Sequence, residues 1–202
     1  KIPGDSVAGV SLVQSDASTK VTEGGATDTF TLALKTQPTG VVQITLQADA
    51  QLSLDKPSVA FAPDSSNADI PQWDVPQTIT VTAADDAIAE GDHTGTVALT
   101  TSSSDTDYDQ LTVESLTVAI TDNDQPGLKI VETDNVTQVT EGGDGDELKI
   151  SLLTQPATAV TVTLTNVDGE VGADPTALTF DAQNWNVPQS VQVNAVNDQD
   201  LE

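Results

Sequence analysis

Hydrophobic and polar residues alternate along several short stretches of the chain, and turn-forming residues separate these stretches. At residues 78–82, Thr-Ile-Thr-Val-Thr, the apolar side chains Ile79 and Val81 fall on one side of an extended backbone and the threonines on the other. This period of two predicts a β-strand with one buried face. The same reasoning predicts strands at 29–34, 41–46, 78–82, 96–100 and 116–121. No stretch of helical length shows a period of 3.6 residues with capping residues. About seven short strands in about 115 residues favour an immunoglobulin-like antiparallel β-sandwich.

An internal repeat covers most of the chain and sets its domain organisation. The segment Val-Thr-Glu-Gly-Gly at 21–25 returns at 139–143, an offset of 118 residues. The segment Trp-Asp-Val-Pro-Gln at 73–77 returns as Trp-Asn-Val-Pro-Gln at 185–189, an offset of 112 residues. The first copy therefore carries an insertion within 63–72. We expect two tandem modules, residues 1–125 and residues 126–202.

The second module is expected to be incomplete. It lacks counterparts of residues 94–124, which hold the last two predicted strands and the acidic triplet that follows them. Its unpaired strand edges are a potential pairing surface for a neighbouring copy. A chain that starts without Met and stops inside a repeat is expected to be a segment of a longer protein, and Leu201 and Glu202 have the form of a cloning remnant.

Composition narrows the function classes. The formal net charge of the 202 residues is −26, with six Lys and no Arg, which argues against nucleic acid and anionic membranes as partners. No apolar run is long enough to insert into a bilayer. The chain has no Cys, so a structural metal is the obvious substitute for disulfide cross-links. The alternative explanation for scattered acidic residues is a surface adapted to solubility or high salinity.

Acidic side chains gather in three predicted turns. Glu23 precedes Gly24-Gly25, Asp86 and Glu90 share a short loop, and Asp122 and Asp124 follow the last strand of the first module. Calcium takes six to eight oxygen ligands from carboxylates and carbonyls, and alternating positions in an extended loop present them on one side. Three separate solvated turns are the alternative. Recurrence of two of these acids in the second module, as Glu141 and Asp198, favours a calcium site.

These residues resemble the Calx-beta domain, a calcium-binding immunoglobulin-like module. The shared marks are the Thr-Glu-Gly turn at 22–24, the Asp-Asp-x-x-x-Glu-Gly loop at 85–91 and the closing triplet at 122–124. The resemblance implies that the three loops meet at one end of the sandwich and hold several Ca²⁺ ions. The implied ligands are Glu23, Asp86, Ile88 through its carbonyl, Glu90, Asp122, Asn123 and Asp124, with a weaker partial site at Glu141 and Asp198. Asp49 and Asp55 compete for one further ligand position, and neither is chosen.

The sequence offers little for catalysis. The only histidine, His93, is expected to be a surface residue beside the acidic loop, and there is no cysteine nucleophile. Trp73 and Trp185 are expected to close one end of each sandwich rather than to stack on sugars. The chain is therefore expected not to be an enzyme.

The favoured function is a calcium-binding structural module of a large extracellular or cell-surface repeat protein, such as an adhesin, whose direct partners are Ca²⁺ and the adjacent repeats. A protein or glycan ligand would bind elsewhere in the parent protein. One alternative is a cytosolic calcium sensor, as Calx-beta domains are in sodium/calcium exchangers. Another is a glycan- or protein-binding module attached to an extracellular hydrolase.

Overall fold

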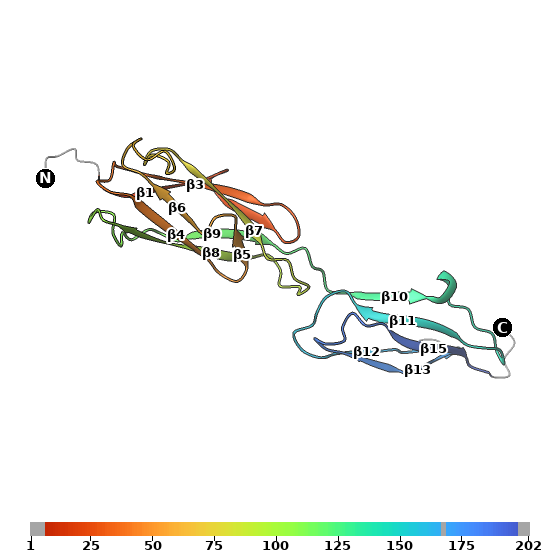
Figure 1. Cartoon of the computed structure of the whole chain (residues 1–202). Coiled ribbons are helices and arrows are strands. Elements are labelled where there is room, and N and C mark those ends of the chain that lie inside the picture. The colour runs from red at the N-terminus through yellow and green to blue at the C-terminus, as the bar shows by residue number, and fades with distance from the viewer. Residues whose placement is uncertain (1–6, 167–168, 198–202) are drawn as a thin grey trace. The chain divides into compact units, whose positions relative to one another are not determined.

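The structure is a computed structural model that describes residues 7–166 and 169–197. These residues form two compact units (Figure 1). The first comprises the residues up to Asp86 together with Gly91–Asn123, and the second comprises Ala87–Glu90 and the residues from Asp124 on. The described residues hold strands and one 3-10 turn, Thr133–Asn135, but no α-helix. No helix among them is long and apolar enough to cross a membrane.

The first unit is a sandwich of two β-sheets (Figure 1). One sheet has the order β1 (Val10–Gln14), β3 (Asp28–Leu34), β7 (Gln77–Ala83) and β5 (Leu52–Leu54). The other has the order β2 (Thr19–Thr22), β9 (Leu116–Thr121), β8 (His93–Ser103), β4 (Val42–Ala48) and β6 (Ser58–Phe61). All neighbouring strands are antiparallel except β2 and β9, which run parallel. The all-β immunoglobulin-like fold predicted from the sequence is confirmed.

The core of the first unit lies between the two sheets and follows from the alternation in the sequence. In β7, Ile79 and Val81 are fully buried, as their spacing predicted. In β8 every second residue from Gly95 to Thr101 is buried. Each large apolar side chain buried in this way contributes roughly 1.5–3 kcal/mol to folding. Trp73 packs against the edge of this core, in agreement with its expected structural role.

The described residues of the second unit form the same first sheet and part of the second sheet. Its larger sheet has the order β10 (Leu128–Glu132), β11 (Asp146–Leu152), β15 (Gln189–Ala195) and β13 (Val171–Asp174). By the repeat offsets these strands correspond to β1, β3, β7 and β5. Its smaller sheet pairs β12 (Val160–Thr163) with β14 (Ala177–Phe180), the counterparts of β4 and β6. A core centred on Phe180 and Val191 joins the sheets, and Trp185 packs against it.

One short strand depends on a partner far away in the sequence. In the first unit β2 pairs with β9 alone. The counterpart of β2 in the repeat, residues 137–140, is not a strand. Because the described part of the second unit has no strand equivalent to β9, the backbone of 137–140 lacks the ladder that makes β2 a strand.

An aspartate at the start of β3, and its repeat counterpart at the start of β11, accept equivalent hydrogen bonds from the backbone. The Asp28 carboxylate accepts hydrogen bonds from the backbone N–H groups of Lys20 and Thr29, at 2.8 and 2.7 Å, and from the Ser15 hydroxyl. Partial burial raises the pKa of Asp28, but the hydrogen bonds from Ser15, Lys20 and Thr29 outweigh it and lower the pKa below 3.8. In the second unit Asp146 accepts equivalent bonds from the N–H groups of residues 138 and 147.

We expect Asp28→Asn to lower the free energy of unfolding of the first unit by about 0.5–1 kcal/mol near neutral pH, the net contribution of such hydrogen bonds when water screens them. A depressed pKa in the folded state contributes stability above the unfolded pKa and loses it as the pH falls through the folded value. The difference from wild type should therefore shrink below about pH 4. Urea unfolding at pH 7 and pH 3 measures it, with exposed Asp74→Asn as the control. A difference that does not change with pH would contradict this role.

Candidate metal centre

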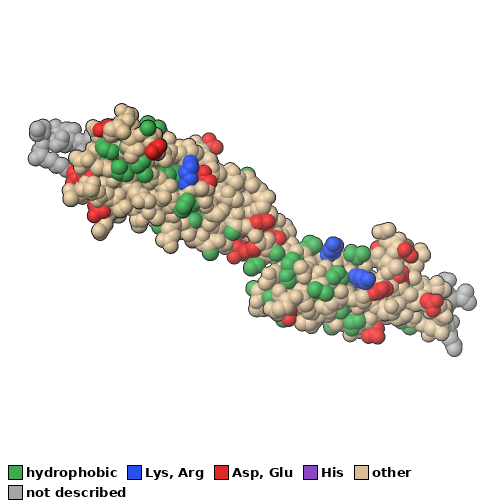
Figure 2. Space-filling view, in the orientation of Figure 1, with side chains coloured by type: hydrophobic (Ala, Val, Ile, Leu, Met, Phe, Trp, Pro, Cys, Tyr) green, Lys and Arg blue, Asp and Glu red, His purple; other side chains and the backbone are tan. Residues whose placement is uncertain are grey.

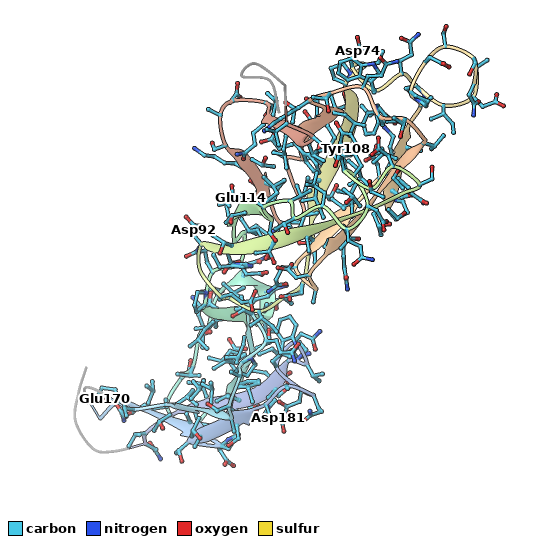
Figure 3. The ribbon with its side chains drawn as sticks, turned by 90° about the vertical axis from the view of Figure 1, so that its left-hand side faces the viewer. Asp74, Asp92, Tyr108, Glu114, Glu170 and Asp181 are labelled. Carbon is cyan, nitrogen blue, oxygen red and sulfur yellow. The ribbon has the colours of Figure 1, made fainter. Side chains whose placement is uncertain are left out.

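Four strand ends meet at one end of the first sandwich. β3 begins and β7 ends there, since Asp28 pairs with Val81, and β8 begins where β9 ends, since His93 pairs with Ile120. The connections at this end are the Glu23 turn, the loop at 84–92 and the segment after β9. Figure 3 labels Asp92, directly before β8, and Tyr108, beyond the other end of that strand. The Glu23 turn and the end of β9 thus lie at one end of the first unit, and the loop at 84–92, whose residues Ala87–Glu90 are counted with the second unit, joins β7 to β8 there.

Glu23 is buried in this end by the turn that carries it. Its backbone N–H donates to the Thr121 carbonyl at 3.1 Å, which ties the turn to the end of β9. Gly24 follows with φ +57°, a left-handed conformation that favours glycine. A Cβ atom at Gly24 would also lie 2.9 Å from Asn123 Nδ2 and from an Asp85 carboxylate oxygen. The Glu-Gly pair of the motif therefore permits a close approach of three chain segments, and the Glu23 side chain is left only 2 % exposed.

Three carboxylates come together around Glu23. One carboxylate oxygen each of Glu23, Asp122 and Asp124 lies within 4.8 Å of the others, and we call these residues the carboxylate cluster. Asp122 and Asp124 continue the alternation of β9, in which Ile120 is buried and Thr121 exposed. Asp124 is counted with the second unit, but it is bonded directly to Asn123 of the first. The sequence-based expectation that the turn and the closing triplet converge is thus met for these three residues.

Burial makes the carboxylate cluster electrostatically costly. Asp122 is 8 % exposed, and its Oδ2 accepts a hydrogen bond from the Gly91 N–H at 2.6 Å. Two unit charges 4.8 Å apart repel by roughly 3 kcal/mol at an effective dielectric constant near 20. Such a group of acids favours a bound cation, which replaces repulsion by attraction.

A second group of potential ligands shares Glu23. Glu90, His93 and Glu23 each offer one ligand atom within 4.8 Å of the others. His93 Nε2 lies 4.0 Å from Glu23 Oε1, and Nδ1 is 2.9 Å from the Gly91 carbonyl oxygen. His93 lies beside the acidic loop as expected, and its side chain is half-buried there, 22 % exposed, and faces the acidic end. The alternation of β8 is the signal that finds it, since buried Val97 and Gly95 place His93 on the same inner face.

Asn123 connects the three acidic turns. Its side-chain Nδ2 donates to the Glu23 carbonyl at 2.9 Å and to the Asp85 carboxylate at 3.3 Å. An amide can make these bonds at its nitrogen and still present its oxygen to a metal, so the predicted ligand role of Asn123 stays a prediction. Asp85 was not among the ligands predicted from the sequence. Its hydrogen bond with Asn123 links the loop at 84–92 to the segment after β9.

The other predicted ligands have different surroundings. Asp86 and Ile88 are exposed and belong to neither group of three metal-binding side chains among the described residues, so their ligand roles stay predictions. The two candidates for a further ligand each accept a hydrogen bond from a strand backbone, and the choice between them stays open. Asp49 accepts a hydrogen bond from the Thr96 N–H at 2.6 Å, and Asp55 accepts one from the Thr80 N–H at 2.7 Å.

The second repeat differs at the corresponding place. Glu141, the counterpart of buried Glu23, is exposed, and it belongs to no such group among the residues the structure describes. The Glu23 turn is buried because it bonds to the end of β9. Among its described residues the second unit has no strand equivalent to β9 to which the Glu141 turn could bond. Asp198, the other predicted ligand of the partial site, lies outside the described residues.

No known sequence family matches the chain, and no curated protein matches it either. Solved structures do resemble it. CBD12 from CALX1.2 is 16 % identical over 94 % of this chain and 76 % of its own, with a TM-score of 0.40. The calcium-binding domain CBD12 of CALX1.1 is 17 % identical over 93 % of this chain and 76 % of its own, with a TM-score of 0.38. The chaperone DraB of E. coli is 9 % identical over 92 % of this chain and 87 % of its own, with a TM-score of 0.39. These likenesses are remote, and the fold is defined by the strand pairing described above.

Proposed function

We propose that the first unit is a calcium-binding module whose ion is held by the carboxylate cluster. The observation that carries this proposal is the burial of Glu23 and Asp122 within 4.8 Å of each other and of Asp124. Natural proteins place carboxylates together in a low-dielectric environment when a cation or a proton resolves their repulsion. An oxygen-only set from two chain segments suits a hard divalent cation, and Ca²⁺ accepts the irregular geometry of such loops.

The calcium ion would act as a cross-link at the end of the sandwich. The Glu23 turn and the end of β9 would be held by one ion, and Glu90 and His93 lie close enough to Glu23 to widen the ligand set. The chain has no disulfide available to do this, since it contains no cysteine. Binding of this kind stabilises the folded unit by an amount that grows with the logarithm of the free calcium concentration above the dissociation constant.

We further propose that the chain is an extender segment of an extracellular or cell-surface repeat protein, and that calcium stiffens the joint between its units. Asp122 belongs to the first unit, and Asp124 is the residue at which the chain passes into the second. An ion bound by Asp122 and Asp124 would order the backbone at this joint. The charge of −26 and the repeat of the sequence suit a cation-dependent rod.

Small-angle X-ray scattering tests the stiffening. In 2 mM CaCl₂ the whole chain is expected to give a larger and better-defined maximum dimension than in EGTA, by roughly 5–10 Å, because a free hinge samples bent arrangements. The same measurement on Asp122→Asn/Asp124→Asn should show no effect of calcium. If calcium removal leaves the maximum dimension of the wild type unchanged, calcium does not stiffen the joint. Calcium binding itself is tested separately, by titration.

Calcium affinity distinguishes the extender from the cytosolic sensor. A dissociation constant of about 10⁻⁴ to 10⁻³ M is typical of extracellular modules, which remain loaded outside the cell. A dissociation constant near 10⁻⁶ M would favour the sensor instead. Isothermal titration calorimetry of the whole chain provides this number.

A further inference from the structure

The first strand of the first unit leaves one edge of its sheet open. β1 lies at the end of the order β1, β3, β7 and β5, and no strand among the described residues pairs with its other edge. Its repeat counterpart β10 also lies at the end of its sheet, although the whole first unit precedes it. The open edge of β1 therefore follows from the strand order that both repeats share.

The backbone of β1 presents hydrogen-bonding groups along this edge. The Ser15 N–H, directly after β1, donates to the Thr29 carbonyl of β3 at 3.2 Å. Because bonded and non-bonded pairs alternate in an antiparallel ladder, the odd-numbered residues of β1 bond to β3. The N–H and C=O groups of Val10, Leu12 and Gln14 therefore point away from β3, where an added strand could bond to them.

A groove of about 750 Å³ lies between β1 and residues 111–117, which lead into β9. The apolar residues Val10, Leu12, Leu111 and Val113 line this groove, and their half-buried side chains pack against the core of the first unit. β2 pairs only with the last four residues of β9, so it does not cover this part of the flank. The groove thus combines the open backbone of β1 with apolar side chains that reach the core.

β1 lacks the features that protect many edge strands, which are short or carry Lys, Pro or other charged residues. It has five residues, whereas the other edge strands of the first unit, β2, β5 and β6, have three or four. Its sequence, Val-Ser-Leu-Val-Gln, contains no charge and no proline. β10 carries Lys129 and Glu132 at the positions of Ser11 and Gln14. The first unit therefore leaves open an edge that carries charged residues in the second.

We propose that the groove binds an extended segment of another protein, apolar at alternate positions and flanked by Lys or Arg, as a strand added to β1. The backbone groups of β1 recognise an extended chain. Successive side chains of a strand point to opposite faces, so every second residue of the added strand would lie against Leu12 and Val113. The partner is a peptide segment rather than a small molecule, because the recognising groups are spread along a strand.

Charge selects a cationic partner over a second copy of this chain. The two charged residues of the groove, Lys35 and Glu114, which is labelled in Figure 3, offset each other. The whole chain has a formal net charge of −26, and Figure 2 shows acidic side chains spread over the visible surface. This field attracts a segment with Lys or Arg at its ends and repels another copy. The groove contains no member of the carboxylate cluster, so its test is independent of calcium binding.

The probe is the peptide Lys-Val-Thr-Val-Thr-Val-Lys, labelled with fluorescein at its C-terminus and added to the whole chain. Fluorescence anisotropy is expected to show saturable binding. Hydrogen exchange is expected to slow by at least about tenfold at the Val10 and Leu12 amides, which gain partners. The Ser11 and Val13 amides bond to β3 already and should change little. No saturable binding would overturn the proposal. Protection of the Val10 and Leu12 amides before peptide is added would also overturn it, since another segment or a second copy would then cover the edge.

Two further peptides test the chemistry of the partner. Glu-Val-Thr-Val-Thr-Val-Glu keeps the alternation but reverses the charge, and we expect it to bind at least about tenfold more weakly at low salt. Lys-Thr-Thr-Val-Val-Val-Lys keeps the composition and the charge but breaks the alternation, and we expect binding at least about fivefold weaker, because fewer apolar side chains face the groove. Equal binding of the three peptides would contradict the proposed partner.

A variant of the protein tests the place of binding. Ser11→Lys/Gln14→Glu gives β1 the charges of β10 without changing the net charge, and we expect it to weaken binding by at least about tenfold. Gln43→Lys/Gln47→Glu is the matched control, because it places the same charges at exposed positions of β4, which has strand partners on both edges. This control should bind within about threefold of the wild type. Urea unfolding checks that both variants fold. A folded Ser11→Lys/Gln14→Glu variant that binds the peptide as tightly as the wild type would rule out strand addition at β1.

Discussion

Replacing Glu23 with glutamine is expected to stabilise the calcium-free protein and to weaken calcium binding at the same time. Glu23 is 2 % exposed and belongs to both groups of potential ligands. Without a cation, removing its charge relieves repulsion with Asp122 and Asp124, and we expect a gain of about 1–3 kcal/mol in the free energy of unfolding of the first unit. With calcium the same change removes a central ligand, and we expect affinity to fall by about 100-fold.

Urea unfolding in EGTA and in CaCl₂, at pH 8, measures both effects of Glu23→Gln. Glu141→Gln is the matched control, because Glu141 is the repeat counterpart of Glu23 and is exposed. It should change neither stability nor calcium dependence by more than about 0.5 kcal/mol. If Glu23→Gln destabilised the calcium-free protein, repulsion within the carboxylate cluster would not lower the stability of the calcium-free fold.

Calcium should raise the unfolding temperature of the first unit, and Asp122→Asn/Asp124→Asn should abolish the rise. At a free concentration about 100 times the dissociation constant, binding adds about 2.7 kcal/mol to the free energy of unfolding. For a unit of this size that corresponds to a shift of about 10 °C. The double variant keeps the side-chain volumes but leaves Glu23 as the only carboxylate of the cluster. Differential scanning calorimetry can separate the transitions of the two units.

The control for the double variant is Asp74→Asn/Asp107→Asn. Both aspartates are exposed, and the pair removes the same formal charge. Asp74 lies away from Asp92 and the start of β8 (Figure 3). This control should keep the full calcium-dependent shift. An equal loss of the shift in both variants would indicate that calcium acts through overall charge screening rather than through the carboxylate cluster.

Much of the first unit's fold could be predicted because its strands bury alternate residues. The predicted strand 116–121 coincides with β9, and Ile79 and Val81 point inward as the alternation requires. The sequence indicated about seven strands where nine form. The short strands β2 and β5 each owe their pairing to a strand elsewhere in the chain, β9 and β7. Such pairings depend on tertiary structure, which local alternation does not encode.

The candidate site could be predicted in part, for a similar reason. Glu23, Asp122 and Asp124 were found because a turn motif and the strand alternation mark them. The part of His93 in the second group of potential ligands was not predicted, although the period of β8 puts it on the inner face with Val97. Asp49 could not be resolved from sequence, because its bond to the backbone of Thr96 arises only when β4 and β8 pair.

Isothermal titration calorimetry of the whole chain with CaCl₂ tests the central claim most directly. The wild type is expected to bind calcium with a dissociation constant of about 10⁻⁴ to 10⁻³ M, and Asp122→Asn/Asp124→Asn is expected to show no saturable heat. Asp74→Asn/Asp107→Asn should titrate like the wild type. A wild type without saturable binding, or a double variant that binds calcium as tightly as the wild type, would contradict a calcium site built from Glu23, Asp122 and Asp124.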